Sequence, residues 1–395
     1  MSTRNRWLLP SGIEEVLPED ARIIEIYRRK LLDLYSSWGY QLVIPPFIEF
    51  LDSLLVGECE DLNLQTFKLT DQLTGRTMGV RADMTPQVAR IDAHMLNSQG
   101  PTRLCYCGTV LHTRPETAGG TRSPLQIGAE LYGHSGIESD IEIIKLMIAT
   151  INNSGIDSVL LDLDHTGILE SLIEKAGFNP DTQNDLLQML QHKSLPDLEK
   201  LMSQTDCPDE IKTAILDLVN LHGKKEVLER ARISLNAGGK KVSQCLDYLE
   251  KLSTMVASKL PEIDIHFDLA ESRGYHYQHG VVFTAFCANS GKELARGGRY
   301  DNIGESFGRA RPATGFSADL RQLITASTLK FESAGKLILS PAIDDPQLEE
   351  TISQLRVQGD IVIHALQSED TASELSGCTH SLQKENNKWV VKDIT

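Results

Sequence analysis

Hydrophobic positions with a helical period come first along the chain. The segment begins with Pro18, followed by the acidic residues Glu19 and Asp20. Apolar side chains then recur every three or four residues as far as Trp38, and Gly39 ends the run. Proline in the first turn and acidic residues beside it both favour a helix N-terminus. The pattern therefore predicts one long helix, followed by a strand over 40–44 that stops at Pro45.

Alternation with a period of two predicts the strands. It predicts a hairpin over 67–81 and single strands over 103–111, 124–134, 158–164, 263–269 and 275–287. Thr85 and Pro86 suit the N-cap and first position of a helix after the hairpin. The glycine-rich segment 296–301 is expected to form a turn, ahead of a last helix over 314–327.

The pattern changes twice along the chain, and these changes set the expected domains. Residues 166–258 are rich in Leu, Glu, Lys, Gln and Ala and have helical periodicity, which indicates a helical insertion. The tail from Lys336 alternates strand, helix, strand and a closing hairpin. We therefore expect an α+β protein with an antiparallel-sheet core over 1–165 and 259–328, the insertion over 166–258, and a small α/β domain over 329–395.

The strand over 124–134 has an unusual polar face. Leu125, Ile127, Ala129 and Leu131 share one face, and Gln126, Gly128, Glu130 and Tyr132 share the other. The glycine leaves room for a molecule against the backbone, and Gln126 and Glu130 offer an amide and a carboxylate beside it. A solvent-facing strand of an antiparallel sheet would show the same pattern. Both interpretations stay open.

Two further segments carry polar groups suited to a ligand. Arg273 can hold a carboxylate with its planar guanidinium, and Tyr277 supplies a phenol. An ordinary strand after a turn would also have this pattern. His276 and His279 have no third residue spaced to complete a metal site, so no metal is expected there.

Composition and charge narrow the function classes. The formal net charge is −16, and no long run of lysine or arginine appears, which disfavours a nucleic-acid partner. No run of 18 apolar residues and no secretory h-region is present, so we expect a cytoplasmic protein without membrane contact. Cys105 and Cys107 are expected to be buried thiols of a reduced protein rather than a metal or redox pair.

Taken in order, these segments resemble the catalytic domain of class II histidyl-tRNA synthetases over about residues 8–327. The matching segments are Leu9-Pro10-Ser11-Gly12, Trp38-Gly39-Tyr40 to Pro46 (class motif 1, a dimer interface), Arg81-Ala82-Asp83-Met84-Thr85, Gln126-Ile127-Gly128-Ala129-Glu130, Arg273-Gly274-Tyr275-His276-Tyr277 and Gly297-Gly298-Arg299-Tyr300-Asp301. The resemblance implies a class II synthetase-like antiparallel sheet with flanking helices. It also implies a histidine site formed by Asp83, Thr85, Gln126, Glu130, Arg273 and Tyr277.

The nucleotide side of the family pattern is altered. In the synthetases an arginine of motif 2 grips the α-phosphate of ATP, and His112 stands at that position here, with Arg114 in place of the following acid. Motif 3 normally ends with an arginine over the ATP, and Gln322 replaces it. Imidazole and amide groups cannot make the paired contact of a guanidinium to phosphate. We expect no adenylate formation, no catalytic residues and no cofactor.

A histidine pocket without an ATP site resembles the regulatory subunits of the short form of ATP phosphoribosyltransferase. The short tail also departs from the synthetase anticodon-binding domain, so no tRNA partner is expected. The resemblance implies a homodimer within a hetero-oligomer with the short-form catalytic subunit, in the first step of histidine biosynthesis, with allosteric feedback by histidine. Two alternatives remain: a divergent but active histidyl-tRNA synthetase, and a histidine-sensing module with another partner.

Overall fold

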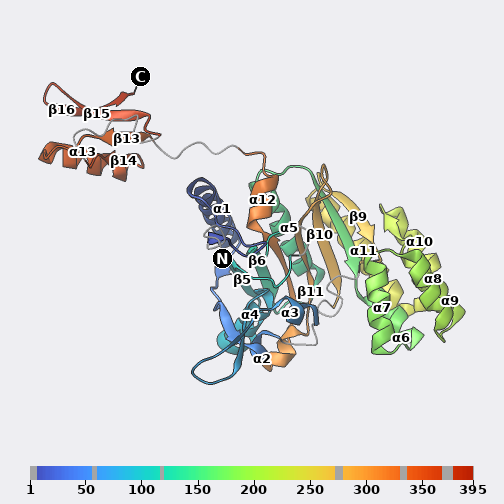
Figure 1. Ribbon diagram of the computed structural model, residues 1–395. Helices are drawn as coiled ribbons and strands as arrows, with labels where there is room; N and C mark the ends of the chain where they lie inside the picture. The colour runs from blue at the N-terminus through green and yellow to red at the C-terminus, as the bar shows by residue number, and fades with distance from the viewer. Residues whose placement is uncertain are drawn as a thin grey trace. The chain divides into compact units, whose positions relative to one another are not determined.

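The computed structural model describes residues 7–55, 60–115, 120–271, 279–329, 336–366 and 377–394. The chain divides into two compact units, Met1–Thr328 and Leu329–Thr395 (Figure 1). The larger unit is built on a nine-stranded sheet. Its strands lie in the order β1 (Gln41–Leu42), β5 (Thr102–Thr109), β6 (Leu125–Tyr132), β12 (Ala313–Asp319), β11 (Glu293–Arg299), β10 (Val281–Cys287), β7 (Val159–His165), β9 (Asp264–Asp268) and β8 (His222–Gly223).

Most neighbours in this sheet are antiparallel, and the exceptions are the pairs β1–β5 and β7–β9, which are parallel. A separate three-stranded sheet contains β2 (Ile48–Phe50), β4 (Thr77–Val80) and β3 (Lys68–Thr70). The hairpin β3–β4 agrees with the hairpin predicted over 67–81. The expected strand after the first helix is shorter than predicted, because only Gln41 and Leu42 pair with β5.

Helices cover both faces of the large sheet. On one face lie α1 (Pro18–Ser37) and α5 (Ile137–Asn153), and the ring of Tyr35 on α1 meets Phe316 of β12 edge-on. On the other face, α4 (Thr85–Arg90) packs Val88 and Ala89 against Leu104 and Tyr106 of β5. The sheet therefore has two separately covered faces, and residues of one strand face alternately toward each.

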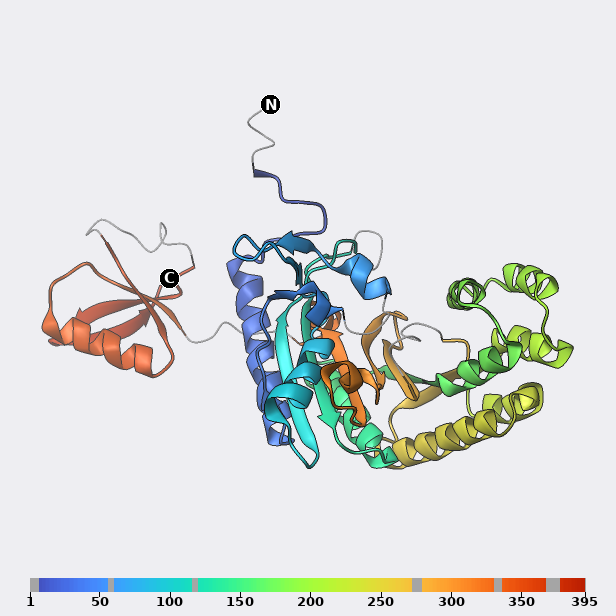
Figure 2. The same ribbon diagram turned by 90° about the horizontal axis from the view of Figure 1, so that it is seen from below.

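The helical segment lies at the end of the sheet beyond β9, as the two views in Figures 1 and 2 show. Its helices are α6 (Gly167–Ala176), α7 (Pro180–Gln191), α8 (Leu195–Gln204), α9 (Asp209–Leu218), α10 (Glu226–Ser234) and α11 (Lys240–Lys259). The long helix α11 returns to the core (Figure 2), and the short strand β8 joins the sheet edge by pairing with β9. Other helices among the described residues of this unit are α2 (Leu51–Leu54), α3 (Glu60–Gln65), α12 (Leu320–Ala326), a π-helix at Ile91–Leu96 and 3-10 turns at Asn236–Gly238 and Ile303–Phe307.

Three local predictions were wrong. The segment Arg296 to Arg299 lies within strand β11 and is not a turn, and the predicted last helix begins as strand β12 and becomes helical only at Leu320. Thr85 is the first residue of α4, and Met84 is the N-cap, so the threonine side chain is available for other contacts. In β11 and β12 the glycines pair with residues of neighbouring strands, and the Thr85 hydroxyl contacts the Tyr106 hydroxyl. Local sequence periodicity does not show these long-range contacts.

The smaller unit forms the α/β fold expected of the tail. Its sheet has the order β14 (Ile361–His364), β13 (Leu337–Ser340), β15 (His380–Glu385) and β16 (Lys388–Asp393). Helix α13 (Pro346–Val357) packs Leu348 and Ile352 against Ile338, and the side chain of Asp345 caps its N-terminus. The unit therefore has a hydrophobic core of its own.

Candidate ligand site

The polar face of β6 lies inside the protein. Glu130 is 1% exposed and Tyr132 is 2% exposed. The strand lies between β5 and β12, and Glu130 pairs with Leu104 on one side and Gly315 on the other. The alternative that this face of the strand is exposed to solvent is therefore excluded, because the side chains of Glu130 and Tyr132 on it are fully buried.

The carboxylate of Glu130 is held by two tyrosines. The Tyr106 hydroxyl donates to Oε1 at 2.9 Å, and the Tyr300 hydroxyl donates to Oε2. Burial raises the pKa of Glu130 to about 8, because removal from water disfavours the charged form more than the two phenol hydrogen bonds favour it. The site therefore contains a carboxyl group poised to change protonation near neutral pH.

Small residues make space for these side chains. A Cβ at Gly315 would lie 1.5 Å from Glu130 Oε2, and a Cβ at Gly128 would lie 2.6 Å from the Tyr106 hydroxyl oxygen. Gly128 was expected to leave room for a molecule against the backbone, and the side chain of Tyr106 fills that room. Both glycines are thus required by the network around Glu130.

A second part of the site surrounds Asp83. Its Oδ1 accepts hydrogen bonds from Gln126 Nε2 at 2.8 Å and from the Thr85 backbone N–H at 3.0 Å. Gln126 Oε1 accepts from the Met84 N–H at 2.9 Å, which fixes the amide orientation. The Thr85 and Tyr106 hydroxyl oxygens lie 3.2 Å apart and join this part to Glu130.

The structure therefore brings together Asp83, Thr85, Gln126 and Glu130 from distant parts of the sequence. Arg273 and Tyr277 lie outside the described residues, as does His276. Sequence reasoning missed Tyr106 and gave no role to Tyr300. The period of two over 103–111 was a usable signal for Tyr106, because it places this residue on the face of β5 that meets Gly128. Tyr300 could not be found in this way while its segment was interpreted as a turn.

The two positions altered on the nucleotide side differ in their surroundings. His112 is 5% exposed, and its Nε2–H donates to the Ala82 carbonyl oxygen at 2.9 Å. Gln322 is exposed on α12, whose N-terminus is capped by Asp319. An imidazole turned inward to a backbone carbonyl is not available to a phosphate group.

Arginines near the site are used for structure. Arg81 Nε donates to the Thr109 carbonyl oxygen at 2.9 Å, and its Nη1 donates to the Pro45 carbonyl oxygen at 2.8 Å. Arg299 is held by Asp140 with Nη2 2.8 Å from Oδ1, and both side chains are at most 8% exposed. These guanidinium groups tie the strands of the sheet to neighbouring segments.

Membrane-spanning helices and metal-binding clusters are both missing from the described residues. In those parts of the chain no helix has the length and hydropathy needed to cross a bilayer. Among the same residues, no group of three or more histidine, cysteine, aspartate or glutamate side chains is arranged to hold a metal ion. Cys105 is buried and Cys107 half-buried, both as free thiols.

Comparison with protein families gives two matches that follow each other along the chain. Residues 12–323 match the histidyl-tRNA synthetase family, and residues 335–392 match the C-terminal domain of the ATP phosphoribosyltransferase subunit HisZ. Among solved structures, an ATP phosphoribosyltransferase regulatory subunit/histidyl-tRNA synthetase from Bacillus halodurans superposes with a TM-score of 0.80 at 25% identity, covering 94% of this chain and 96% of that one. A histidyl-tRNA synthetase from Nostoc sp. PCC 7120 superposes with a TM-score of 0.78 at 19% identity over 98% of this chain and 95% of that one, which shows the shared fold.

Curated relatives match over the full length. An ATP phosphoribosyltransferase regulatory subunit of Thioalkalivibrio sulfidiphilus is 50% identical over 100% of both chains. One from Methylococcus capsulatus is 47% identical over 98% of this chain and 96% of its own. These relatives are regulatory subunits by name. The chain belongs to the family of ATP phosphoribosyltransferase regulatory subunits, which have a class II synthetase-like fold and act in histidine biosynthesis.

Proposed function

We propose that this regulatory subunit binds free histidine at the network around Glu130 and makes a short-form catalytic subunit responsive to it. The observation that carries the proposal is the buried carboxylate of Glu130, oriented by Tyr106 and Tyr300. Carboxylate oxygens each accept more than one hydrogen bond, so Glu130 retains capacity for an imidazole N–H. A fixed acceptor in a buried site favours a ligand with a polar side chain over one with an apolar side chain, because the apolar ligand would leave the acceptor without a hydrogen bond.

The other side chains have complementary roles in this proposal. Asp83 and Thr85 would receive the α-ammonium group, and Gln126 orients Asp83 through its 2.8 Å hydrogen bond. Arg273 would pair with the α-carboxylate, and Tyr277 would contact the imidazole, as the resemblance to the synthetases implies. With His112 turned inward and Gln322 in place of an arginine, the bound amino acid would remain unactivated.

The assembly is proposed as a homodimer within a hetero-oligomer that acts in the cytoplasm. Strand β1 is at an edge of the large sheet, and its Leu42 is 46% exposed. Next to it, Ile44 is 81% exposed and Phe47 is 45% exposed. An edge strand with exposed apolar side chains beside it is suited to pairing with a second copy.

The proposed domain boundaries are those of the core over 1–165 and 259–328, the helical insertion over 166–258 and the small domain over 329–395. Helices α6 to α11 occupy Gly167 to Lys259, which supports the insertion. The division into compact units after Thr328 supports the last boundary.

The test measures phosphoribosyl-ATP formation by a short-form catalytic chain with and without this subunit, across a histidine titration. We expect the two chains to co-elute, the rate to rise with this subunit, and histidine to reverse the gain. By linkage, complex formation should change histidine affinity by the same factor.

The matched variants are Glu130→Gln in the site and Glu349→Gln on the exposed face of α13. Calorimetry at about pH 9, where Glu130 with its pKa of about 8 is ionised, should show histidine binding weakened by about tenfold or more in Glu130→Gln, because a hydrogen bond to a charged group is worth about 1.5–3 kcal/mol. Glu349→Gln should bind as the unmodified protein does. Equal histidine affinity in all three proteins would refute the site, and a catalytic rate indifferent to this subunit would refute the regulatory mechanism.

A further inference from the structure

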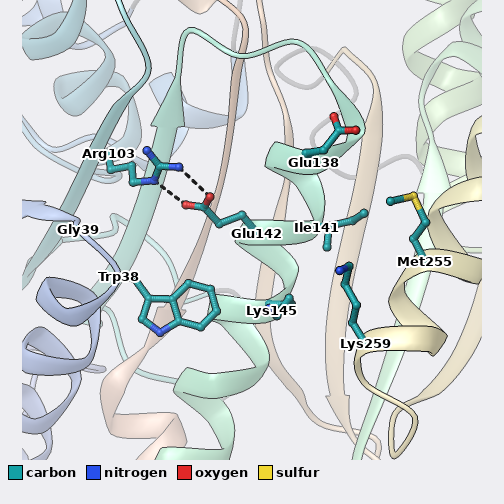
Figure 3. A pocket seen from close by; sticks show the side chains of 9 residues that line it. All are labelled: Trp38, Gly39, Arg103, Glu138, Ile141, Glu142, Lys145, Met255 and Lys259. Carbon is teal, nitrogen blue, oxygen red and sulfur yellow. Dashed lines mark hydrogen bonds and ion pairs between the residues drawn. The ribbon is translucent and has the colours of Figure 1, made fainter.

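A cavity of about 490 Å³ lies on the face of the sheet opposite Glu130 (Figure 3). Arg103 of β5 forms part of its wall and pairs with Leu131, whereas Glu130 pairs with the next residue, Leu104. Because successive side chains of a strand point to opposite faces, Arg103 and Glu130 project in opposite directions. The cavity and the candidate ligand site are therefore separate places on the same pair of strands.

Four segments meet at this cavity. Trp38 follows α1, Arg103 lies on β5, a stripe of α5 contributes Glu142 and Lys145, and α11 contributes Lys259. Figure 3 shows Trp38 and the Arg103–Glu142 pair on one side and Lys259 across from them. All four segments belong to the larger unit. A volume of this size is within the range of about 300–1,000 Å³ that binds small organic molecules.

The charges in the cavity do not cancel. Arg103 and Glu142 neutralise each other through two hydrogen bonds of 2.7 and 2.8 Å, and the Tyr40 hydroxyl donates to the same carboxylate at 3.0 Å. Among the described residues, Lys145 and Lys259 form no ion pair and no hydrogen bond, and Glu138 is the one other acid of the lining. Lys145 also helps to lower the pKa of Glu142 by its positive charge. Three cations and two acids therefore line the cavity, an excess of positive charge in a chain whose formal net charge is −16.

An aromatic surface lies beside these cations. The Lys145 ammonium nitrogen is 5.4 Å from the centre of the Trp38 ring, in cation–π range. The half-buried Trp38 and the apolar Ile141 and Met255 provide surface for a flat, weakly polar group. Lysine side chains bind phosphate and carboxylate groups as mobile point charges.

We propose that this cavity is a second ligand site, which binds a small anion attached to a flat ring, the ring lying against Trp38 and the anionic group between Lys145 and Lys259. A ring-bearing phosphate and a ring-bearing carboxylate share this chemistry. The site is independent of the proposed histidine site, because it uses none of the same side chains.

The experiment uses the full chain labelled with 5-fluorotryptophan, which gives fluorine NMR signals from Trp7, Trp38 and Trp389, the three tryptophans of the sequence. Trp38→Phe assigns the Trp38 signal. Adenosine 5′-monophosphate, phenylacetate, adenosine and inorganic phosphate are titrated separately. We expect either adenosine 5′-monophosphate or phenylacetate to shift the Trp38 signal and to leave the Trp7 and Trp389 signals unchanged. A shift by the first indicates that the site binds a phosphate, and a shift by the second indicates a carboxylate.

Adenosine and inorganic phosphate should bind at least tenfold more weakly than the ring-bearing anion that binds. Lys145→Ala and Lys259→Ala should each weaken that binding about tenfold, whereas Lys251→Ala, exposed on the same helix as Lys259, should leave it unchanged. Thermal unfolding of each variant checks that it is folded.

Three outcomes would overturn the proposal. One is a Trp38 signal that no ring-bearing anion moves at ~10 mM, which corresponds to a binding free energy below about 3 kcal/mol. The second is equal binding by the lysine variants, or by neutral adenosine, because the anion would then be irrelevant. The third is a Trp38 signal moved by the catalytic subunit but by no small anion, because the cavity would then be a protein contact.

Discussion

Glu130 has a consequence for the pH dependence of folding. Its carboxyl group has a pKa of about 8 in the folded protein, against an ordinary value near 4.3 in an unfolded chain. Between these values the folded state holds the proton and the unfolded state releases it. Its contribution is therefore fully present below about pH 4.3 and is lost progressively as the pH rises to about 8.

We predict that the free energy of unfolding of the protein falls, relative to that of Glu130→Gln, as the pH is raised from 5 to 8. The difference should change by up to about 1.4 kcal/mol per pH unit. Urea unfolding of both proteins at several pH values measures it, and Glu349→Gln serves as the exposed control. Parallel pH profiles for the protein and Glu130→Gln would show that Glu130 keeps an ordinary pKa.

At the scale of elements, Asp140 joins three of them. On α5, it accepts from Arg299 of β11 at 2.8 Å and also from the Tyr248 hydroxyl of α11. Asp140 is 0% exposed, so its charge is fully removed from water. Removal of one partner from a buried ion pair leaves the other charge uncompensated.

Asp140→Asn should therefore lower the free energy of unfolding by about 3–5 kcal/mol, the usual cost of breaking a buried pair. Glu250→Gln, which removes one carboxylate of the half-exposed Arg232–Glu250 pair, should cost less than about 1 kcal/mol. Denaturant unfolding of both variants checks the contrast. If the two substitutions cost the same, the Asp140 cluster contributes no more than a surface pair.

Some elements of the fold can be predicted from the sequence alone, and others cannot. Helix α1 and the elements of the C-terminal unit follow from local periodicity, because each buries one regular stripe or face. Strand β11 was interpreted as a turn because of Gly297 and Gly298, and strand β12, which contains Gly315, was interpreted as the start of a helix. The absent side chains of these glycines serve cross-strand packing, against Phe283 at Gly297 and against Glu130 at Gly315. Of the residues predicted for the histidine site, the structure brings Asp83, Thr85, Gln126 and Glu130 together. Tyr106 and Tyr300 were not predicted, because their part in this network depends on contacts across strands.

At the scale of the whole molecule, two independent observations divide the chain at nearly the same place. The boundary between the two compact units falls between Thr328 and Leu329 in the sequence. The first family match ends at residue 323, and the second begins at residue 335. The described residues of the proposed histidine site all lie in the first unit, and the second has a separate core around Ile338. Each unit is therefore expected to maintain its own fold.

We predict that a chain ending at Thr328 binds histidine with an affinity within about twofold of the full chain, a change of less than about 0.5 kcal/mol. Calorimetry on the two proteins makes the comparison, with circular dichroism to verify that the shorter chain is folded. A loss of tenfold or more in a folded short chain would mean that the C-terminal unit completes the site.

The hydrogen bonds around Glu130 also bear on how far this part of the core can change in sequence while the chain still folds. Tyr106, Glu130 and Tyr300 come from three different segments, and each is at most 3% exposed. Substituting any of them leaves buried polar groups without partners, which costs about 1–3 kcal/mol for each group. Selection for a folded chain alone thus opposes their replacement, while exposed positions such as Gln322 carry no such penalty. The side chains of the proposed histidine site are thus held in the core by the stability of the fold itself, in addition to any selection for binding.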